Sequence, residues 1–462
     1  MHRIFFFLLS FLVACSADSS KKNSPKGNVA EEKPSPLRKE IFETGKILPK
    51  IACTTDPSQS FAFCLPSSYD TSKKFPVIIF FDPHGSGNFV VTKYAPLAEE
   101  FNTILIASND SKNGLTFDQT NQIANTLVNE ATHRFSTGQE VILAGFSGGA
   151  RVAISSAMSN QQVESVIYCG AAMPIQKDTR LFSLLGFAGM YDMNYTDVIL
   201  FDQSLQNSNY NHFLIEWNGK HEWPDSVTFR DAFYWITFNR MHTHEIPFNP
   251  QLAQQFVDEN SKKLNTDNGY AETAAVNRKI MGFLSGLADV TKYASALSQA
   301  EQNPIYKKEM DQKQHIQQQE TELKKQYVDA FQTKDLNWWK AEITRMNAIN
   351  DIQQKPMYQR LLGFISLAGF SISNNAIQQN KFPLAEKMLA IYKLADPKNS
   401  DQPFLEACMF AKQGMNEKAM ESLQHAVDLG LNDASRILNE PALSSLLQDE
   451  KLKTLLSKMK QS

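Results

Sequence analysis

The chain has 462 residues, of which 42% are hydrophobic and 21% charged, an ordinary composition for a globular protein. At this length two domains are more usual than one. The formal net charge is −3 and the folded part holds no basic block, so the composition does not favour binding to nucleic acid or a polybasic contact with a membrane.

The chain begins with a sequence typical of a secretory signal. One arginine precedes an apolar run, Ile4 to Cys15, that is too short to span a bilayer. The run ends in Leu12-Val13-Ala14-Cys15, which resembles a bacterial lipobox. That resemblance implies cleavage of residues 1–14 and a diacylglycerol on the thiol of Cys15. An ordinary signal peptide, cut nearby, is the alternative.

Residues 15–40 predict a flexible tether. From Ser16 to about Arg38 the chain is rich in Ser, Lys, Pro and Asn and has no aromatic residue. Such a segment cannot bury enough apolar surface to offset its ordering entropy. Since Ser16 stands where an aspartate would favour retention at the inner membrane in some bacteria, we expect an outer-membrane lipoprotein.

Four cysteines follow the tether. Cys53 and Cys64 enclose a turn signal ahead of a short strand, Phe61 to Phe63. Because an exported protein enters an oxidising compartment, we expect a disulfide between them, and two unpaired thiols are the alternative. Cys169 falls in an apolar strand and Cys408 in a helix, so both predict buried thiols.

Residues 41–247 predict an α/β domain. Short apolar runs alternate there with helical patterns such as Thr120–Arg134. Continuous apolar strands alternating with helices indicate a mainly parallel sheet covered on both faces. The runs expected as strands are 75–81, 103–107, 141–144, 163–170, 184–189 and 212–217.

A candidate nucleophile lies in the middle of this domain. The apolar run 141–144 leads into Gly145-Phe146-Ser147-Gly148-Gly149, which fits the Gly-x-Ser-x-Gly pattern, and a helical stretch, 151–158, follows. Strand, tight turn and helix in that order are what a nucleophile elbow requires. Ser147 is therefore the predicted nucleophile. The alternative is a turn whose glycines only permit close packing.

Three further loops follow strands of the same sheet. The Gly-rich loop Asp82–Gly87 comes directly after the run ending at Phe81, and we expect the amides of Ser86 and Gly148 to form an oxyanion hole. Asp192 comes just past one strand, and His221 lies in a Gly-containing loop after the last.

The chain order Ser147, Asp192, His221 is that of an α/β-hydrolase triad. Residues of about 60–240 resemble the α/β-hydrolase superfamily, near its dienelactone hydrolase, feruloyl esterase and polyhydroxybutyrate depolymerase-like branches. The stretch Gly219–Pro224, Gly-Lys-His-Glu-Trp-Pro, is similar to their Gly-Gly-His-x-Trp-Pro histidine loop. The oxyanion loop departs from their His-Gly-Gly pattern. The resemblance implies a serine hydrolase in which Ser147 attacks, His221 acts as base and then acid, and Asp192 orients the imidazole.

Other residues compete less well for these roles. Asp197 and Asp202 are rival carboxylates on the helix that follows Asp192. His242 and His244 lie beyond the sheet and indicate an exposed pair rather than metal ligands. His221-Glu222 is not a zinc-protease motif, since Pro224 breaks any helix there. We expect neither a cofactor nor a metal.

From residue 248 onward the sequence predicts helices only. Residues 248–365 are rich in Gln, Lys, Glu, Ala and Leu, and the pair Trp338-Trp339 predicts packing between helices rather than a binding box. In 366–432, Ala385 and Ala419 stand 34 residues apart, each four residues before a leucine. This spacing resembles tetratricopeptide repeats and implies a groove that docks a protein or peptide. Packing on the hydrolase domain is the alternative role, and 433–462 predict a helical cap.

The sequence as a whole predicts an exported, lipid-anchored serine hydrolase of the cell envelope. Carboxylic esters are the expected substrates, cleaved through an acyl-enzyme without a cofactor. A serine peptidase of the prolyl-oligopeptidase type is one alternative. The other is a non-catalytic scaffold lipoprotein whose repeats bind a partner and whose hydrolase fold is vestigial.

The lipobox makes the first testable prediction. Cys15→Ala should release the protein from membranes or block its processing, because a single acyl chain binds only marginally and stable anchoring needs several chains at Cys15. Fractionation of cells and mass spectrometry of the mature N-terminus measure both effects. Soluble wild-type protein cut upstream of an unmodified Cys15 would contradict the prediction.

Overall fold

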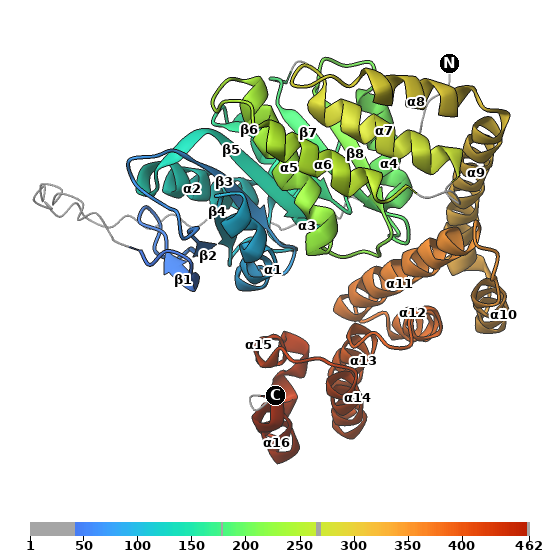
Figure 1. Cartoon of the computed structure of the whole chain (residues 1–462). Helices are drawn as coiled ribbons and strands as arrows, with labels where there is room; N and C mark the ends of the chain where they lie inside the picture. Colours follow the sequence, from blue (N-terminus) through green and yellow to red (C-terminus); the bar gives the residue numbers. More distant parts are fainter. Residues whose placement is uncertain (1–41, 177–178, 265–268, 460–462) are drawn as a thin grey trace, which may run out of the picture. The chain divides into compact units, whose positions relative to one another are not determined.

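The structure is a computed structural model that describes residues 42–176, 179–264 and 269–459 (Figure 1). The predicted signal peptide, the lipidation site at Cys15 and the tether up to residue 40 lie outside these residues. The part from Phe42 onward forms one compact unit. Within the described ranges, no helix is both long and apolar enough to cross a membrane.

An eight-stranded sheet with the order β1-β2-β4-β3-β5-β6-β7-β8 forms the first half of this unit. The strands from β4 to β8 in that order pair in parallel, while β2 pairs antiparallel with both β1 and β4. The predicted α/β fold class is confirmed. The strands are β1 (Ile47–Ala52), β2 (Ser60–Cys64), β3 (Phe75–Phe81), β4 (Ile104–Ser108), β5 (Thr137–Phe146), β6 (Val163–Cys169), β7 (Ser183–Gly189) and β8 (His212–Trp217).

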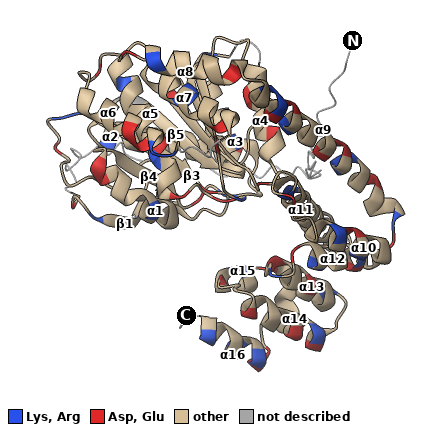
Figure 2. Cartoon of the chain, turned by 45° about the vertical axis from the view of Figure 1, so that its right-hand side comes forward, with Lys and Arg blue, Asp and Glu red and all other residues tan. Residues whose placement is uncertain are grey.

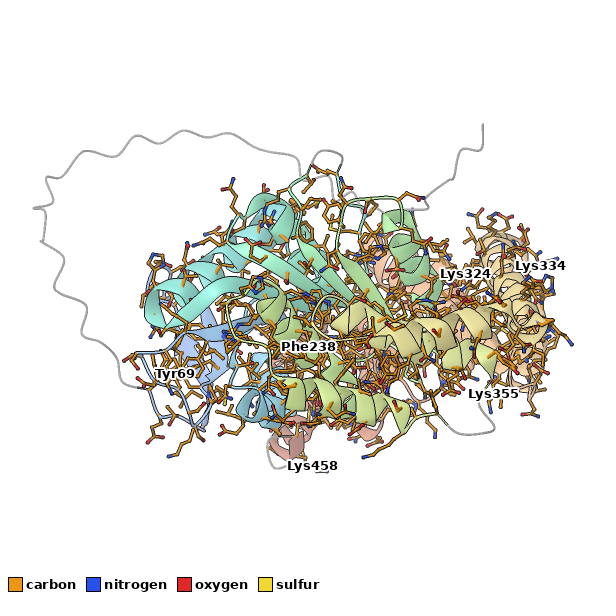
Figure 3. All side chains as sticks on the ribbon, turned by 45° about the horizontal axis from the view of Figure 1, so that its top comes forward. Tyr69, Phe238, Lys324, Lys334, Lys355 and Lys458 are labelled. Atoms are coloured by element: carbon orange, nitrogen blue, oxygen red, sulfur yellow. The ribbon has the colours of Figure 1, made fainter. Side chains whose placement is uncertain are left out.

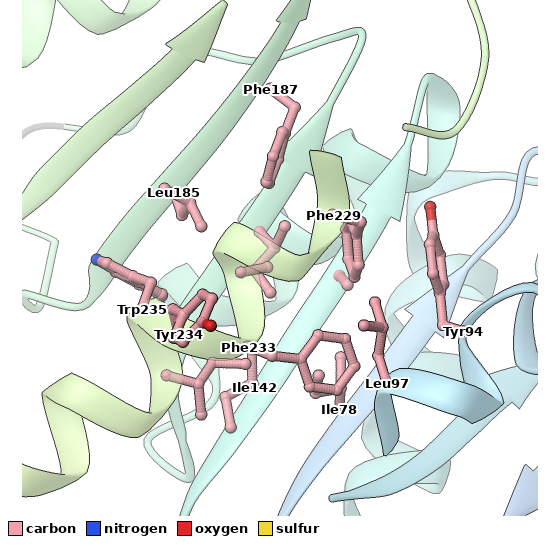
Figure 4. Packing of buried hydrophobic residues seen from close by; sticks show 14 of the residues in the cluster. Ile78, Tyr94, Leu97, Ile142, Leu185, Phe187, Phe229, Phe233, Tyr234 and Trp235 are labelled. Atoms are coloured by element: carbon pink, nitrogen blue, oxygen red, sulfur yellow. The ribbon is translucent and has the colours of Figure 1, made fainter. Parts of the chain in front are cut away.

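Helices cover both faces of the sheet, which is why its central strands are apolar throughout. One face packs on α2 (Phe117–Arg134), α3 (Gly148–Ser159) and α4 (Tyr195–Leu205). The other packs on α1 (Gly87–Glu100), α5 (Ser226–His242), α6 (Pro250–Ser261) and α7 (Tyr270–Leu284). Figure 4 shows Phe229 and Phe233 of α5 close to Ile78 of β3 and Ile142 of β5.

The core of the sheet extends beyond the boundary predicted at residue 247. Phe256 of α6 and Phe283 of α7 are buried in the same cluster as β3 and β5, and their rings stack with centroids 5.1 Å apart. Helical periodicity alone cannot distinguish a helix that completes a sheet's core from one that starts a new domain.

The remaining elements are helical. Tyr293 of the first one packs against the core of the sheet, while residues 316–395 form one further core and residues 370–459 form another. Trp339 is fully buried in the first of these cores and stacks on Phe331 at 4.8 Å, so the predicted packing role of this tryptophan is confirmed. Both signs of charge alternate along the 30-residue α9 (Figure 2). The elements are α8 (Thr291–Gln302), α9 (Pro304–Thr333), α10 (Leu336–Asn347), α11 (Lys355–Gln378), α12 (Phe382–Ala395), α13 (Asp401–Lys412), α14 (Asn416–Asp428), α15 (Ala434–Leu438), the 3-10 helix η1 (Pro441–Leu446) and α16 (Glu450–Met459).

The 34-residue spacing coincides with a repeated helical hairpin. The end of α11 pairs with α12, and α13 pairs with α14. Asn380 and Gly414, also 34 residues apart, both take positive φ angles, 56° and 74°, in the turns of these hairpins. Ala385 and Ala419 are fully buried at equivalent places. Membership of the tetratricopeptide family stays a prediction.

The disulfide expected between Cys53 and Cys64 is wrong, because both thiols are free. Cys64 pairs with Ile47 at one end of the β1–β2 hairpin, whereas Cys53 follows Ala52, which pairs with Ser60 at the other end. Ser60 and Cys64, which mark the two ends, are four residues apart, roughly 13 Å at about 3.3 Å per residue, and Cys53 lies one residue further on. The thiols also belong to different cores, on opposite faces of the sheet. No disulfide spans such a distance.

Thiol accessibility tests this correction. Burial raises the pKa of Cys53 and of Cys408 to about 12 and also raises the pKa of Cys64 and Cys169. Since the thiolate is the reactive form, native protein should react with iodoacetamide only slowly at these four positions. Unfolding without reductant should expose all four to alkylation. Mass spectrometry that finds Cys53 and Cys64 in one unreduced peptide pair would contradict the structure.

Candidate active site

Ser147 lies in the tight turn between β5 and α3. Its backbone has φ 53° and ψ −118°, a strained conformation for a residue with a side chain. Close packing holds the turn. A Cβ on Gly149 would lie 1.8 Å from the carbonyl oxygen of Phe81, and a Cβ on Gly145 would lie 2.1 Å from the carbonyl oxygen of Gly149. The amide of Ser147 donates to Cys169 O at 2.9 Å. The serine therefore stands at the carboxyl end of β5, where the pattern predicted it.

His221 lies in the loop between β8 and α5. This loop is fixed at its end, because Tyr94 donates to the carbonyl of Pro224 at 2.7 Å and Asp225 caps α5 by accepting from the amide of Thr228 at 2.7 Å. The ring of Phe146 packs on the imidazole with centroids 4.7 Å apart. The imidazole is thus held against the elbow.

The structure brings Ser147, His221 and Asp192 together as one hydrogen-bonded chain. Nε2 of His221 lies 3.0 Å from Oγ of Ser147, and Nδ1 lies 2.9 and 3.0 Å from the two carboxylate oxygens of Asp192. Asp192 is only 1% exposed, whereas the side chain of His221 is 23% exposed. A buried carboxylate and a partly open imidazole are the arrangement that general-base activation of a serine needs.

Two hydrogen bonds made by Asn194 shape the loop that carries Asp192. The amide of Asn194 donates to Asp192 Oδ1 at 2.8 Å, and its side chain donates to Gly170 O at 2.9 Å. The rival carboxylates lie elsewhere, since Asp202 contacts His212 at 2.8 Å and Asp197 is exposed on α4. Of the three candidates, only Asp192 contacts His221 in the described structure.

The two residues predicted to form an oxyanion hole differ in their placement. Gly148 is the first residue of α3, so its amide has no acceptor within the helix. The amide of Ser86 instead points to Asp82 Oδ1 at 3.4 Å. Asn113, which sequence reasoning missed, lies beside Gly148: a Cβ on that glycine would be 2.0 Å from Asn113 Oδ1. The amide nitrogen of Asn113 lies 3.7 Å from the same point, so this side chain also brings an N–H donor close to Gly148.

Asp82 connects the Gly-rich loop to the histidine loop and was also missed. Its carboxylate accepts from the amide of His84 at 2.9 Å and from Nε1 of Trp223 at 2.8 Å. Burial acts to raise the pKa of Asp82, but hydrogen bonds from His84 and Trp223 outweigh burial, so this pKa is lowered. The hydrogen bond to Asp82 raises the pKa of His84 in turn. An aspartate directly after a parallel strand was the only signal in the sequence.

Within residues 42–176, 179–264 and 269–459, no group of three His, Cys, Asp or Glu side chains could hold a metal ion. A cavity of about 470 Å³ lies away from the triad and is lined by residues 241, 244–248, 286 and 287.

Comparisons with known proteins give structural likeness only. No family model and no curated protein matches the chain. A fluorophosphonate-binding serine hydrolase of Staphylococcus aureus is 14% identical and covers 42% of this chain and 99% of its own, with a TM-score of 0.34. Esterase B of Lactobacillus rhamnosis is 13% identical and covers 44% of this chain and 90% of its own, with a TM-score of 0.36. A putative dienelactone hydrolase of Klebsiella pneumoniae is 14% identical and covers 38% of this chain and 88% of its own, with a TM-score of 0.32. Likeness at these TM-scores carries no statement about the activity of this chain.

The Asp82 contacts predict a pH-dependent loss of stability. A carboxylate whose pKa is lowered by folding stabilises the fold above its unfolded pKa of ~3.9, and this contribution is lost as the pH falls through the lower folded value. Asp82→Asn should therefore lower the free energy of unfolding by about 1–3 kcal/mol at pH 7. The difference from wild type should shrink below a pH of ~3.9.

Urea unfolding at several pH values measures this effect. Asp311→Asn is the control. Asp311 is exposed on α9, so this substitution should change the free energy of unfolding little at any pH. An Asp82→Asn variant as stable as wild type at pH 7 would rule out the role given to this carboxylate.

Proposed function

We propose that this protein is a serine hydrolase that cleaves carboxylic esters through an acyl-enzyme. One observation carries the proposal: a single chain of hydrogen bonds joins Asp192, His221 and Ser147, with distances of 2.9 and 3.0 Å. A serine hydroxyl is a weak nucleophile until an adjacent imidazole removes its proton. The strained backbone of Ser147 supports the same function, because strain at one residue persists only where its surroundings impose it.

The geometry supports a two-step mechanism. Ser147 Oγ attacks the carbonyl carbon of the ester while His221 Nε2 takes its proton, and Asp192 stabilises the imidazolium through Nδ1–H. The negative charge on the carbonyl oxygen faces the amide of Gly148 and the N-terminus of α3. When the tetrahedral intermediate collapses, His221 returns the proton to the leaving alcohol. Water then attacks the acyl-enzyme by the same route and releases the acid and free Ser147.

Two alternatives use the same residues differently. A peptidase would need His221 to protonate a leaving amine, which this triad could also do. A scaffold with a vestigial site would need neither the buried carboxylate nor the strained serine, so the assembled triad favours an enzyme. We propose esters because the implied relatives, the dienelactone hydrolase and feruloyl esterase branches, act on esters.

The cellular setting is also a proposal. The lipobox at Cys15 supports anchoring to the cell envelope, with the outer membrane as the expected site. The repeated hairpins formed by α11 to α14 support a role in docking a protein or peptide.

An activity-based probe tests the catalytic proposal. A fluorophosphonate should label wild-type protein at Ser147, and labelling should fall at acidic pH, where a protonated imidazole cannot accept the proton. Ser147→Ala should abolish both labelling and ester hydrolysis. His221→Ala should cost nearly as much and Asp192→Asn somewhat less, because the three residues act as a unit. Peptide mapping of the labelled protein identifies the serine.

Ser155→Ala serves as the matched control, since Ser155 is a buried serine of α3 that contacts Asn121 and not the triad. A panel of acyl, feruloyl and acetyl-sugar esters and short peptides then separates an esterase from a peptidase. If Ser147→Ala hydrolysed every ester at the wild-type rate, the scaffold alternative would replace the enzyme.

A further inference from the structure

The loop that carries Asp192 is held by two helices from the distant helical part of the chain. This loop, Met190 to Asn194, joins β7 to α4. Side chains of α9 and α11 donate hydrogen bonds to its backbone, although these helices lie 131 and 170 residues further along the chain. The acid of the triad therefore has supports that do not belong to the α/β part of the structure.

Arg360 of α11 makes the most direct of these contacts. Its Nη1 donates to the carbonyl of Met190 at 2.6 Å, two residues before Asp192. Its Nε and Nη2 both donate to Oε2 of Glu320 on α9, at 2.8 and 2.5 Å. Arg360 is 4% exposed and Glu320 is fully buried. The buried ion pair with Glu320 thus fixes Nε and Nη2 of the guanidinium, and the remaining nitrogen, Nη1, donates to the loop.

Lys324, labelled in Figure 3, supports the other end of the loop. It lies one turn after Glu320 on α9, forms an ion pair with it at 3.0 Å, and donates to the carbonyl of Met193 at 2.9 Å. The loop also packs directly on α11, because a Cβ added to Gly363 would lie 3.2 Å from Cβ of Met193. The carbonyls on both sides of Asp192 are therefore bound from the helical part.

A third contact fixes the start of α4. The phenol of Tyr195 donates to Glu216 at 2.5 Å, and Lys313 of α9 donates to the same carboxylate at 2.6 and 2.8 Å. The guanidinium of Arg360 lies 4.6 Å from the centroid of the Tyr195 ring. Helices α9 and α11 thus contact the chain before and after the position of the catalytic acid, at Met190, Met193 and Tyr195.

Stability alone does not explain this arrangement. Removing an arginine and a glutamate from water has a large desolvation cost, and well-packed apolar residues of similar size often stabilise a fold equally well. An arginine fork, however, fixes direction as well as distance, because its donors are planar and rigid.

We propose that Arg360, held by Glu320, is a positioning residue that keeps Asp192 in place for His221 and so makes the helical part necessary for catalysis. This inference rests on the proposed serine hydrolase. Without the bond to Met190 O the loop can shift, the Asp192–His221 hydrogen bond lengthens, and the imidazole loses the partner that sets its orientation.

The variant Arg360→Gln tests the proposal in the full-length protein. Its rate constant for fluorophosphonate labelling should fall by about ten- to a hundredfold, since displacement of a catalytic group by about 1 Å costs up to that much. For an ester substrate, kcat should fall with little change in KM, because Arg360 does not contact the substrate. Arg360→Lys keeps the charge but not the fork and should recover only part of the rate.

Lys279→Gln is the matched control. Lys279 forms a similarly buried ion pair with Asp231 at 2.7 Å, between α5 and α7, and contacts no part of the Asp192 loop. Both variants should lose stability in urea, but only Arg360→Gln should lose labelling rate under conditions where both are folded. Equal losses of rate would show a general effect of destabilisation and overturn the proposal.

A double-mutant cycle makes the test specific. If Arg360 acts through Asp192, Arg360→Gln should slow labelling of an Asp192→Asn protein by less than about twofold. Losses that multiply would contradict the proposal, as would a folded Arg360→Gln variant that labels at the wild-type rate.

A spectroscopic measurement separates this inference from the proposed function. The proton on Nδ1 of His221, bonded to Asp192, should give a downfield proton resonance in wild type and Lys279→Gln that weakens or disappears in Arg360→Gln. A wild-type protein that is not labelled would refute the hydrolase, and the resonance would still decide whether Arg360 positions Asp192. An unchanged resonance in Arg360→Gln would overturn the positioning role.

Discussion

The close approach of the serine turn to the neighbouring strand is the constraint on which the site depends. Only a residue without a Cβ fits at Gly149, against the backbone of β3, and the turn that results forces Ser147 into its strained conformation. The parallel pairing of β3, β5, β6, β7 and β8 then brings the loops after these strands to the same edge of the sheet. Serine, acid and histidine meet there because each follows the carboxyl end of a strand.

This dependence explains which parts of the site could be predicted from sequence. Ser147 follows β5 directly, and Asp192 and His221 lie a few residues past the ends of β7 and β8, so strand recognition and parallel pairing were enough to place them together. The same reasoning placed Gly148 at the N-terminus of a helix. It could not orient the amide of Ser86, which depends on the side chain of Asp82 within the loop.

Predictions failed where the outcome depended on which face a side chain occupies or on contacts between remote segments. An irregular register in the β1–β2 hairpin and the alternation of faces along β2 separate Cys53 from Cys64, and neither is visible in composition or turn signals. Glu320 has the appearance of a solvent-facing charge in a helix rich in Gln, Lys and Glu, and Arg360 is a charge in a mainly apolar helix. The role of the pair follows only from contacts between remote segments, because Arg360 bonds Glu320 on one side and a loop 170 residues earlier on the other.

The burial of α6 and α7 against the sheet has a consequence for how the chain can be divided. A fragment that ended at residue 247 would leave the apolar surface beneath Phe256 and Phe283 open to water, and it would also leave the carbonyls of Met190 and Met193 without their donors. Residues 42–247 are thus not expected to form an independently folding domain, because their core and the Asp192 loop are completed by later helices. Evolution, or an engineer, could exchange the outer hairpins α13–α14 far more freely than α9 or α11, because only the latter two share bonds with the triad's own loop.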